Sequence, residues 1–235
     1  MFSDGSYTDG DSKLYASEKI TFSGNMWIDG EDVSFESPSI VFDNSDAATG
    51  IGIANGSMTL ENTIAEFDNS KWEIPYKGKI AFSGNSAIKL GENSWGKTLI
   101  QSNNLNGDVR FVVDNASVAE NGSEQMCLSA DATNGFENFS VKENTLYAIE
   151  DNGATTGERQ YTITQRDINE IAEKGNYSEE QATLLKAMMQ VSGNSLFDTV
   201  STMVQMGEDA SDILDGMHPA TAAAQSAAFD TTIST

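Results

Sequence analysis

The amino-acid sequence predicts a mainly β protein, namely a right-handed parallel β-helix (a solenoid) followed by a small C-terminal helical segment. Residues 19–25 read KITFSGN and residues 79–85 read KIAFSGN, so one strand-and-turn pattern recurs with a single substitution. Similar runs place four phenylalanines 20, 25 and 15 residues apart, at Phe22, Phe42, Phe67 and Phe82. Stacked coils of about twenty residues produce such a recurrence, because equivalent residues of neighbouring coils are superposed.

Short alternating apolar runs extend from about residue 14 to residue 149, separated by Gly, Asn, Asp and Ser. Each run has the pattern of a strand followed by a turn. Their spacing fits a β-sandwich or a β-solenoid, but only the solenoid predicts a period of roughly twenty residues. We therefore predict parallel strands, with Phe22, Phe42 and Phe82 pointing inward on one face of the interior. Phe67 is expected to be displaced, because its run carries an extra residue.

The composition changes near residue 150, which divides the chain into a predicted solenoid (residues 1–150) and a predicted helical segment (residues 151–235). Thr164, Ser178 and Asn194 each precede an amphipathic run and are predicted N-caps. Six apolar residues are expected to form a small bundle near the last coil, namely Ile168, Ile171, Leu185, Met189, Phe197 and Val200.

Two shorter stretches complete the predicted helical segment. A short helix is expected over residues 209–217, which read DASDILDGM. The alanine-rich run over residues 219–232 has almost no apolar face to bury, so it is expected to be mobile in isolation.

The chain is strongly acidic: 36 Asp and Glu against 13 Lys and Arg give a formal net charge of -23. Such a surface repels phosphate backbones, which excludes nucleic acid as a partner. Hydrophobic residues make up 38% of the chain, which is enough for a packed core. The single cysteine, Cys127, can form no internal disulfide and is interpreted as a small buried hydrophobic residue. The sequence contains neither an apolar run long enough for a membrane-spanning helix nor an N-terminal signal-peptide pattern.

The residue types that enzymes commonly use are scarce. The chain has one histidine, His218, and no zinc, nucleophile-elbow or phosphate-binding motif. We therefore predict no catalytic, cofactor-binding or metal-binding residue and no enzyme activity. Clustered carboxylates are the exception to weigh, because glycosidases work with paired acids. The candidates are Asp29, Glu31, Asp32, Asp43 and Asp46, and their position in turns favours a structural role.

Aromatic side chains offer one further candidate site. Trp27, Trp72 and Trp95 could form a surface on which carbohydrate stacks, because an indole ring combines a large apolar face with one polar N–H group. The competing interpretation places these rings in buried or coil-capping positions.

Two stretches resemble a known family. Residues 105–141 contain a glycine, an apolar strand ending in Asp, a loop and two further strands. The matching residues there are Gly107, Phe111, Val113, Asp114, Met126, Leu128, Gly135 and Val141. Residues 176–224 contain a Gln-bearing helix, an LFD helix and an LDGMH segment, in which Pro219 departs from the pattern. The matching residues there are Leu214, Asp215, Gly216, Met217, His218 and Ala220. In this order the features resemble the passenger end and helical junction of a bacterial classical (type Va) autotransporter.

The resemblance implies a non-enzymatic, surface-exposed passenger fragment that serves as an adhesin stalk and as a folding nucleus. It implies a place at the bacterial cell surface or outer membrane, or secretion, as part of a larger exported virulence-associated precursor. The implied partners are the outer-membrane β-barrel of the same precursor and a host surface, glycans or a second copy. Two alternatives stay open: a β-helix polysaccharide lyase or glycosidase using clustered carboxylates, and an acidic β-sandwich binding module.

Overall fold

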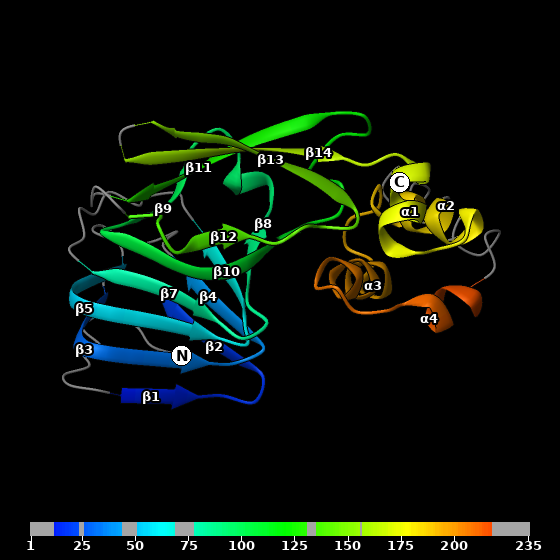
Figure 1. Ribbon diagram of the computed structural model, residues 1–235. Coiled ribbons are helices and arrows are strands. Elements are labelled where there is room, and N and C mark those ends of the chain that lie inside the picture. The colour runs from blue at the N-terminus through cyan, green and yellow to red at the C-terminus, as the bar shows by residue number, and fades with distance from the viewer. Residues whose placement is uncertain are drawn as a thin grey trace, which may run out of the picture. The chain divides into compact units, whose positions relative to one another are not determined.

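The computed structural model describes residues 12–23, 26–43, 51–68, 78–130, 135–155 and 157–217 (Figure 1). The protein is mainly β, with a parallel β-solenoid of about three turns and a few short C-terminal helices. The strands of the solenoid pair in parallel with the next coil. This pairing confirms the predicted fold class and excludes the β-sandwich alternative, because sandwiches are built from antiparallel sheets.

The solenoid has two ladders of parallel strands, and the chain alternates between them (Figure 1). The first ladder consists of β1 (Ser12–Tyr15), β3 (Met26–Glu36), β5 (Ile51–Glu61) and β7 (Lys79–Ser83). The second ladder consists of β2 (Lys19–Ser23), β4 (Ser39–Asp43), β6 (Ile64–Asp68) and β8 (Ala87–Leu90). A long strand, β10 (Asn104–Val113), neighbours both β7 and β8 and so joins the two ladders, while β12 (Phe139–Val141) pairs with β10.

A second sheet has the order β13-β14-β11-β9. Its strands are β13 (Tyr147–Thr155), β14 (Glu158–Gln165), β11 (Ser123–Ala130) and β9 (Thr98–Ser102). A single 3-10 turn, η1 (Glu92–Ser94), precedes β9 among the described residues. Alternation along these strands leaves one side of the sheet apolar and buried and the other side polar.

Phenylalanines stack in register inside the second ladder. Phe22 pairs with Phe42, and Phe42 pairs with Phe67. Their ring centroids lie 5.1 Å and 4.9 Å apart, with planes inclined by only 12° and 9°. The predicted displacement of Phe67 is therefore wrong. Two residues separate β2 from β3 but seven separate β4 from β5, so the longer coil takes up its five extra residues between strands and keeps its register.

Phe82 corrects the prediction in a different way. It is buried as expected, but it belongs to the first ladder, where it pairs with Leu60, the partner of Phe35. The KITFS and KIAFS runs are thus β2 and β7, strands of opposite ladders. Both ladders face one interior, because Phe22 of the second ladder and Phe35 of the first pack edge to face, with ring centroids 5.0 Å apart. The same alternation of inward apolar and outward residues occurs in strands of both ladders. The 15 residues from Phe67 to Phe82 therefore lead from one ladder to the other and do not measure a full coil.

Four helices follow the last strand: α1 (Ile168–Gly175), α2 (Glu179–Met188), α3 (Ser195–Gln205) and α4 (Ser211–Asp215). The predicted caps Ser178 and Asn194 are confirmed, since each side chain accepts a backbone N–H of its helix. Thr164 is not a cap, because β14 continues through it to Gln165. Asp167 caps α1 instead, and Glu170 completes a capping box by accepting the Asp167 N–H.

The chain divides into two compact units, each built from segments that are separate in the sequence. The strand unit comprises residues 1–112, 125–142 and 150–162, and the helical unit comprises residues 113–124, 143–149 and 163–235. Within the helical unit, α2 packs against α1, α3 and α4. The predicted bundle is confirmed there, because all six named residues are buried except Ile168, which is half-buried.

Three points complete the helical unit. The predicted place of the bundle near the last coil stays a prediction. The alanine-rich run of residues 219–232 lies outside the described residues. None of the described helices has both the length and the apolar character that crossing a membrane requires.

Replacing Phe111 by Ala is expected to lower the free energy of unfolding by about 3–5 kcal/mol, because a fully buried ring is lost. Its ring meets Tyr161 edge-on at 5.2 Å, and its strand β10 joins both ladders. Phe22→Ala should lower the free energy of unfolding by less than Phe111→Ala does, because Phe22 lies in β2, an end strand with one strand neighbour. Thr59→Ala, on the outward side of β5, serves as a control and should cost less than about 1 kcal/mol. Equal losses for the two phenylalanine variants in equilibrium urea unfolding would contradict this ranking.

Candidate functional site

Of the five candidate carboxylates, the structure describes the side chains of Asp32 and Asp43. Asp32 is exposed on β3 and accepts a hydrogen bond from the Ser57 hydroxyl. Asp43 is half-buried at the end of β4, so the two acids belong to different ladders. Nowhere in the described part of the chain do three His, Cys, Asp or Glu side chains gather as a metal site requires. The remaining candidates lie outside the described side chains: Asp29, Glu31 and Asp46.

The aromatic and thiol candidates divide in the same way. The side chains of Trp27, Trp72 and His218 lie outside the described residues. Trp95 follows η1 and is half-buried. Cys127 is half-buried on β11 rather than fully buried, and burial together with the nearby Glu158 carboxylate raises the pKa of its thiol. A raised pKa keeps the thiol protonated, which disfavours a nucleophilic role.

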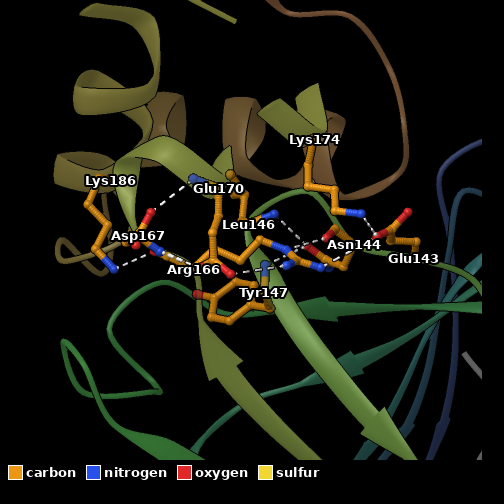
Figure 2. Close-up of polar contacts among 9 residues, drawn as sticks. All are labelled: Glu143, Asn144, Leu146, Tyr147, Arg166, Asp167, Glu170, Lys174 and Lys186. Atoms are coloured by element: carbon orange, nitrogen blue, oxygen red, sulfur yellow. Dashed lines mark hydrogen bonds and ion pairs between the residues drawn. The ribbon is translucent and has the colours of Figure 1, made fainter. Parts of the chain in front are cut away.

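One polar constellation of the helical unit surrounds Arg166 (Figure 2). We call it the Arg166 cluster: Glu143, Arg166, Glu170 and Lys174. The Arg166 guanidinium lies 3.6 Å from Glu143 and 3.7 Å from Glu170, and Lys174 forms an ion pair with Glu143. The Lys174 ammonium, and secondarily Arg166, hold the pKa of the Glu143 carboxyl below its ordinary value. The cluster ties the start of α1 to the segment that precedes β13.

A second constellation, the Gln205 clamp, consists of Val113, Asn144 and Gln205. The Gln205 Oε1 atom accepts the Val113 N–H at 2.8 Å, and the Gln205 amide donates to the Val113 carbonyl at 3.0 Å. A side-chain amide thus binds the last residue of β10 as the peptide group of a neighbouring strand would. Asn144 donates to the same Oε1 at 3.1 Å, and its own Oδ1 accepts the N–H groups of Leu146 and Tyr147. These partners satisfy buried polar groups that would otherwise be costly.

Gln165, the last residue of β14, makes a third set of contacts. Its amide donates to the Val118 carbonyl at 2.6 Å, and its Oε1 accepts from Lys186 at 2.9 Å and from Gln190 at 2.9 Å. Lys186 also donates to the Arg166 carbonyl at 2.8 Å. Burial lowers the pKa of the Lys186 ammonium, although acidic neighbours oppose the shift. Lys186 of α2 therefore binds the end of β14 and the residue after it, while Gln165 itself binds the segment that contains Val118.

These three constellations bind the chain to itself. Their carboxylates, amides and ammonium groups are engaged with one another or with backbone groups, which favours rigid placement of α1, α2 and α3 over chemistry on a substrate. Sequence reasoning missed all of them. The one available signal was Gln205, a polar residue beside Val204 on the face of α3 that is buried.

The chain was compared with protein-family models, curated proteins and solved structures, and none matches. The fold and these contacts define the class: a parallel β-solenoid protein with an attached unit of short helices, compatible in fold with an autotransporter passenger β-helix.

Replacing Gln205 by Leu is expected to unfold the helical unit at lower denaturant concentration. The change removes the amide that binds the buried Val113 N–H and C=O groups. Each group left without a partner is expected to lower the free energy of unfolding by about 1–3 kcal/mol. Far-UV circular dichroism during urea unfolding measures the loss. Gln160→Leu, on an exposed position of β14, is the matched control and should change stability little. A Gln205 variant as stable as this control would show that the clamp contributes no net stability.

The Arg166 cluster predicts a specific pH dependence. Because the folded-state pKa of Glu143 lies below its ordinary value of 4.5, its ion pairs add stability above about pH 4.5. That stability is lost as the pH falls through the lower folded-state pKa. The wild-type protein should therefore exceed Glu143→Gln in unfolding free energy at neutral pH, with a gap that narrows in acid. About 1 M salt should narrow the gap at pH 7 as well. A gap that is constant with pH would contradict this role of Glu143.

Proposed function

We propose that the chain is a non-enzymatic, surface-exposed passenger fragment of the autotransporter type, which serves as an adhesin stalk. The observation that carries the proposal is where the resembling residues lie. Residues 105–141 supply β10, β11 and β12, and four matching residues, Phe111, Val113, Met126 and Leu128, are buried. A strand region followed by short helices has the order of the family's passenger end and junction.

The architecture supports a mechanical role. Each coil adds one layer to the solenoid, so the length of a stalk follows from the number of its coils. An interior of stacked rings and aliphatic side chains contributes rigidity, while most outward positions of these strands are polar, with Val41 and Ala81 as exceptions. The strongly acidic composition, with a net charge of -23, keeps such a surface soluble.

The proposal also includes a folding nucleus in residues 105–141. β10 neighbours strands of both ladders and pairs with β12, so its formation organises more of the solenoid than the formation of an end strand does. Parallel pairing between distant segments is intrinsically slow, because loop-closure entropy must be overcome before contacts form. A preformed strand that offers edges to both ladders reduces that difficulty for the next coil.

The proposed partners and location follow from the same resemblance. The partner in the same precursor is an outer-membrane β-barrel, and the external partner is a host surface or its glycans. The location is the bacterial cell surface or outer membrane, or the medium after secretion.

The coding sequence that surrounds this chain tests the proposal. We expect the reading frame after residue 235 to encode alternating β-barrel strands and the frame before residue 1 to encode an export signal. On intact cells of the source organism, an antibody against the chain should stain the surface, and added protease should remove the stain while a periplasmic marker protein survives. A frame without barrel strands, or a chain found only in the cytoplasm, would refute the proposed function.

A further inference from the structure

The second sheet presents a polar side on which uncharged side chains adjoin the exposed carboxylate of Glu158. Gln160 and Thr162 point to the same side of β14, because Tyr161 between them is buried on the other side. Gln125 of β11 is exposed, and its side chain bonds to that of Gln160. Asn152 of β13 is also exposed, and its side chain bonds to that of Thr162. These four side chains therefore share one side of three adjacent strands.

Hydrogen bonds hold the four side chains in place. The Gln160 amide donates to the Gln125 Oε1 at 3.2 Å, and the Asn152 amide donates to the Thr162 hydroxyl at 2.8 Å. Each amide carries two N–H donors and a carbonyl that accepts two bonds, so these contacts use only part of its capacity. Because these side chains are already held in place, binding a ligand here costs less of their conformational entropy.

An aromatic residue adjoins this row of amides. The Gly96 N–H donates to the Gln125 carbonyl at 2.7 Å, and the Cys127 N–H donates to the Lys97 carbonyl at 3.1 Å. These bonds place Trp95 immediately beside the Gln125 end of β11, with its side chain half-buried. We call Trp95, Gln125, Asn152, Gln160 and Thr162 the amide face. Its polar groups are three planar amides and one hydroxyl, and the partly exposed Trp95 follows at the edge of this row.

Charge decides which ligand suits the amide face. Its five side chains are neutral, the neighbouring Glu158 is exposed on β14, and the whole chain carries a net charge of -23. Phosphorylated, sulfated or carboxylated ligands are therefore repelled. Sugar hydroxyls both donate and accept hydrogen bonds, as amides do, and the C–H side of a pyranose ring packs against an aromatic face. From the amide face we infer that the chain binds a neutral polysaccharide.

This inference rests on the proposed function in one respect: the polysaccharide is the ligand class of the proposed adhesin. Binding itself belongs to the isolated chain. A failure to find the chain at a cell surface would refute the proposed function and leave the binding result standing, whereas a failure to bind would refute only the inference.

The test uses the purified full chain on an array of neutral and anionic glycans, followed by titration calorimetry with the neutral glycan that gives the strongest signal. We expect binding to neutral glycans and none to heparin. The double variant Gln125→Ala, Gln160→Ala should weaken binding at least about tenfold while its melting temperature and circular dichroism stay near the wild-type values. Trp95→Ala should weaken binding more than Trp95→Phe, which keeps an aromatic face.

A matched control changes two outward residues on another sheet, Ser34→Ala and Thr59→Ala, which are register partners on β3 and β5. This control should bind as the wild type does. Binding only to anionic glycans, binding to none, or full affinity in the folded double variant would each overturn the inference. If the double variant does not fold, the glycan affinities of Trp95→Phe and Trp95→Ala are compared instead. Equal affinities of these two variants would also overturn the inference.

Discussion

The ring of Phe42 lies between the rings of Phe22 and Phe67, and this stack depends on strands that pair in parallel without a shift in register. A shift of one residue would turn every inward side chain of a strand outward, because successive side chains point to opposite faces. In this ladder the extra residues of the longer coil therefore lie between strands. The first ladder is less strict, because the pairing of β3 with β5 shifts in register around Gly30.

The helical unit meets a different constraint, because its segments come from three separate parts of the sequence. Apolar packing of α2 against its three neighbouring helices supplies the core, but the connecting segments leave backbone groups that strands do not pair. Gln205 and Gln165 bind such groups with side-chain amides. Buried polar contacts of this kind specify one arrangement, since few other placements would satisfy the same donors and acceptors.

The proposed role of the chain is to present a surface, and the polar contacts of the two units differ in a way that fits this proposal. Glu143, Arg166 and Lys174 form ion pairs with one another in the helical unit, while Gln125, Asn152 and Gln160 of the amide face are exposed. In the proposed role, the acidic character of the chain favours neutral ligands over anionic ones.

The sequence by itself determined the local features. Alternation in runs such as KITFS and SIVFD predicts strands, and Ser178 and Asn194 are read correctly as caps, because strand periodicity and capping act over a few residues. Recurrence near twenty residues further predicts the solenoid, because stacked coils superpose like residues.

Only the tertiary structure decided what depends on partners far along the chain. Phe82 reads like Phe22, yet it lies in the opposite ladder, because one inward-facing pattern serves both sides of a coil. Thr164 resembles a cap, but pairing of β14 within its sheet extends the strand past it to Gln165. The Gln205 clamp joins residues 92 positions apart, and the amide face gathers side chains from three strands and a turn. Such contacts depend on which strands become neighbours, and the local sequence of a strand does not specify its distant neighbours.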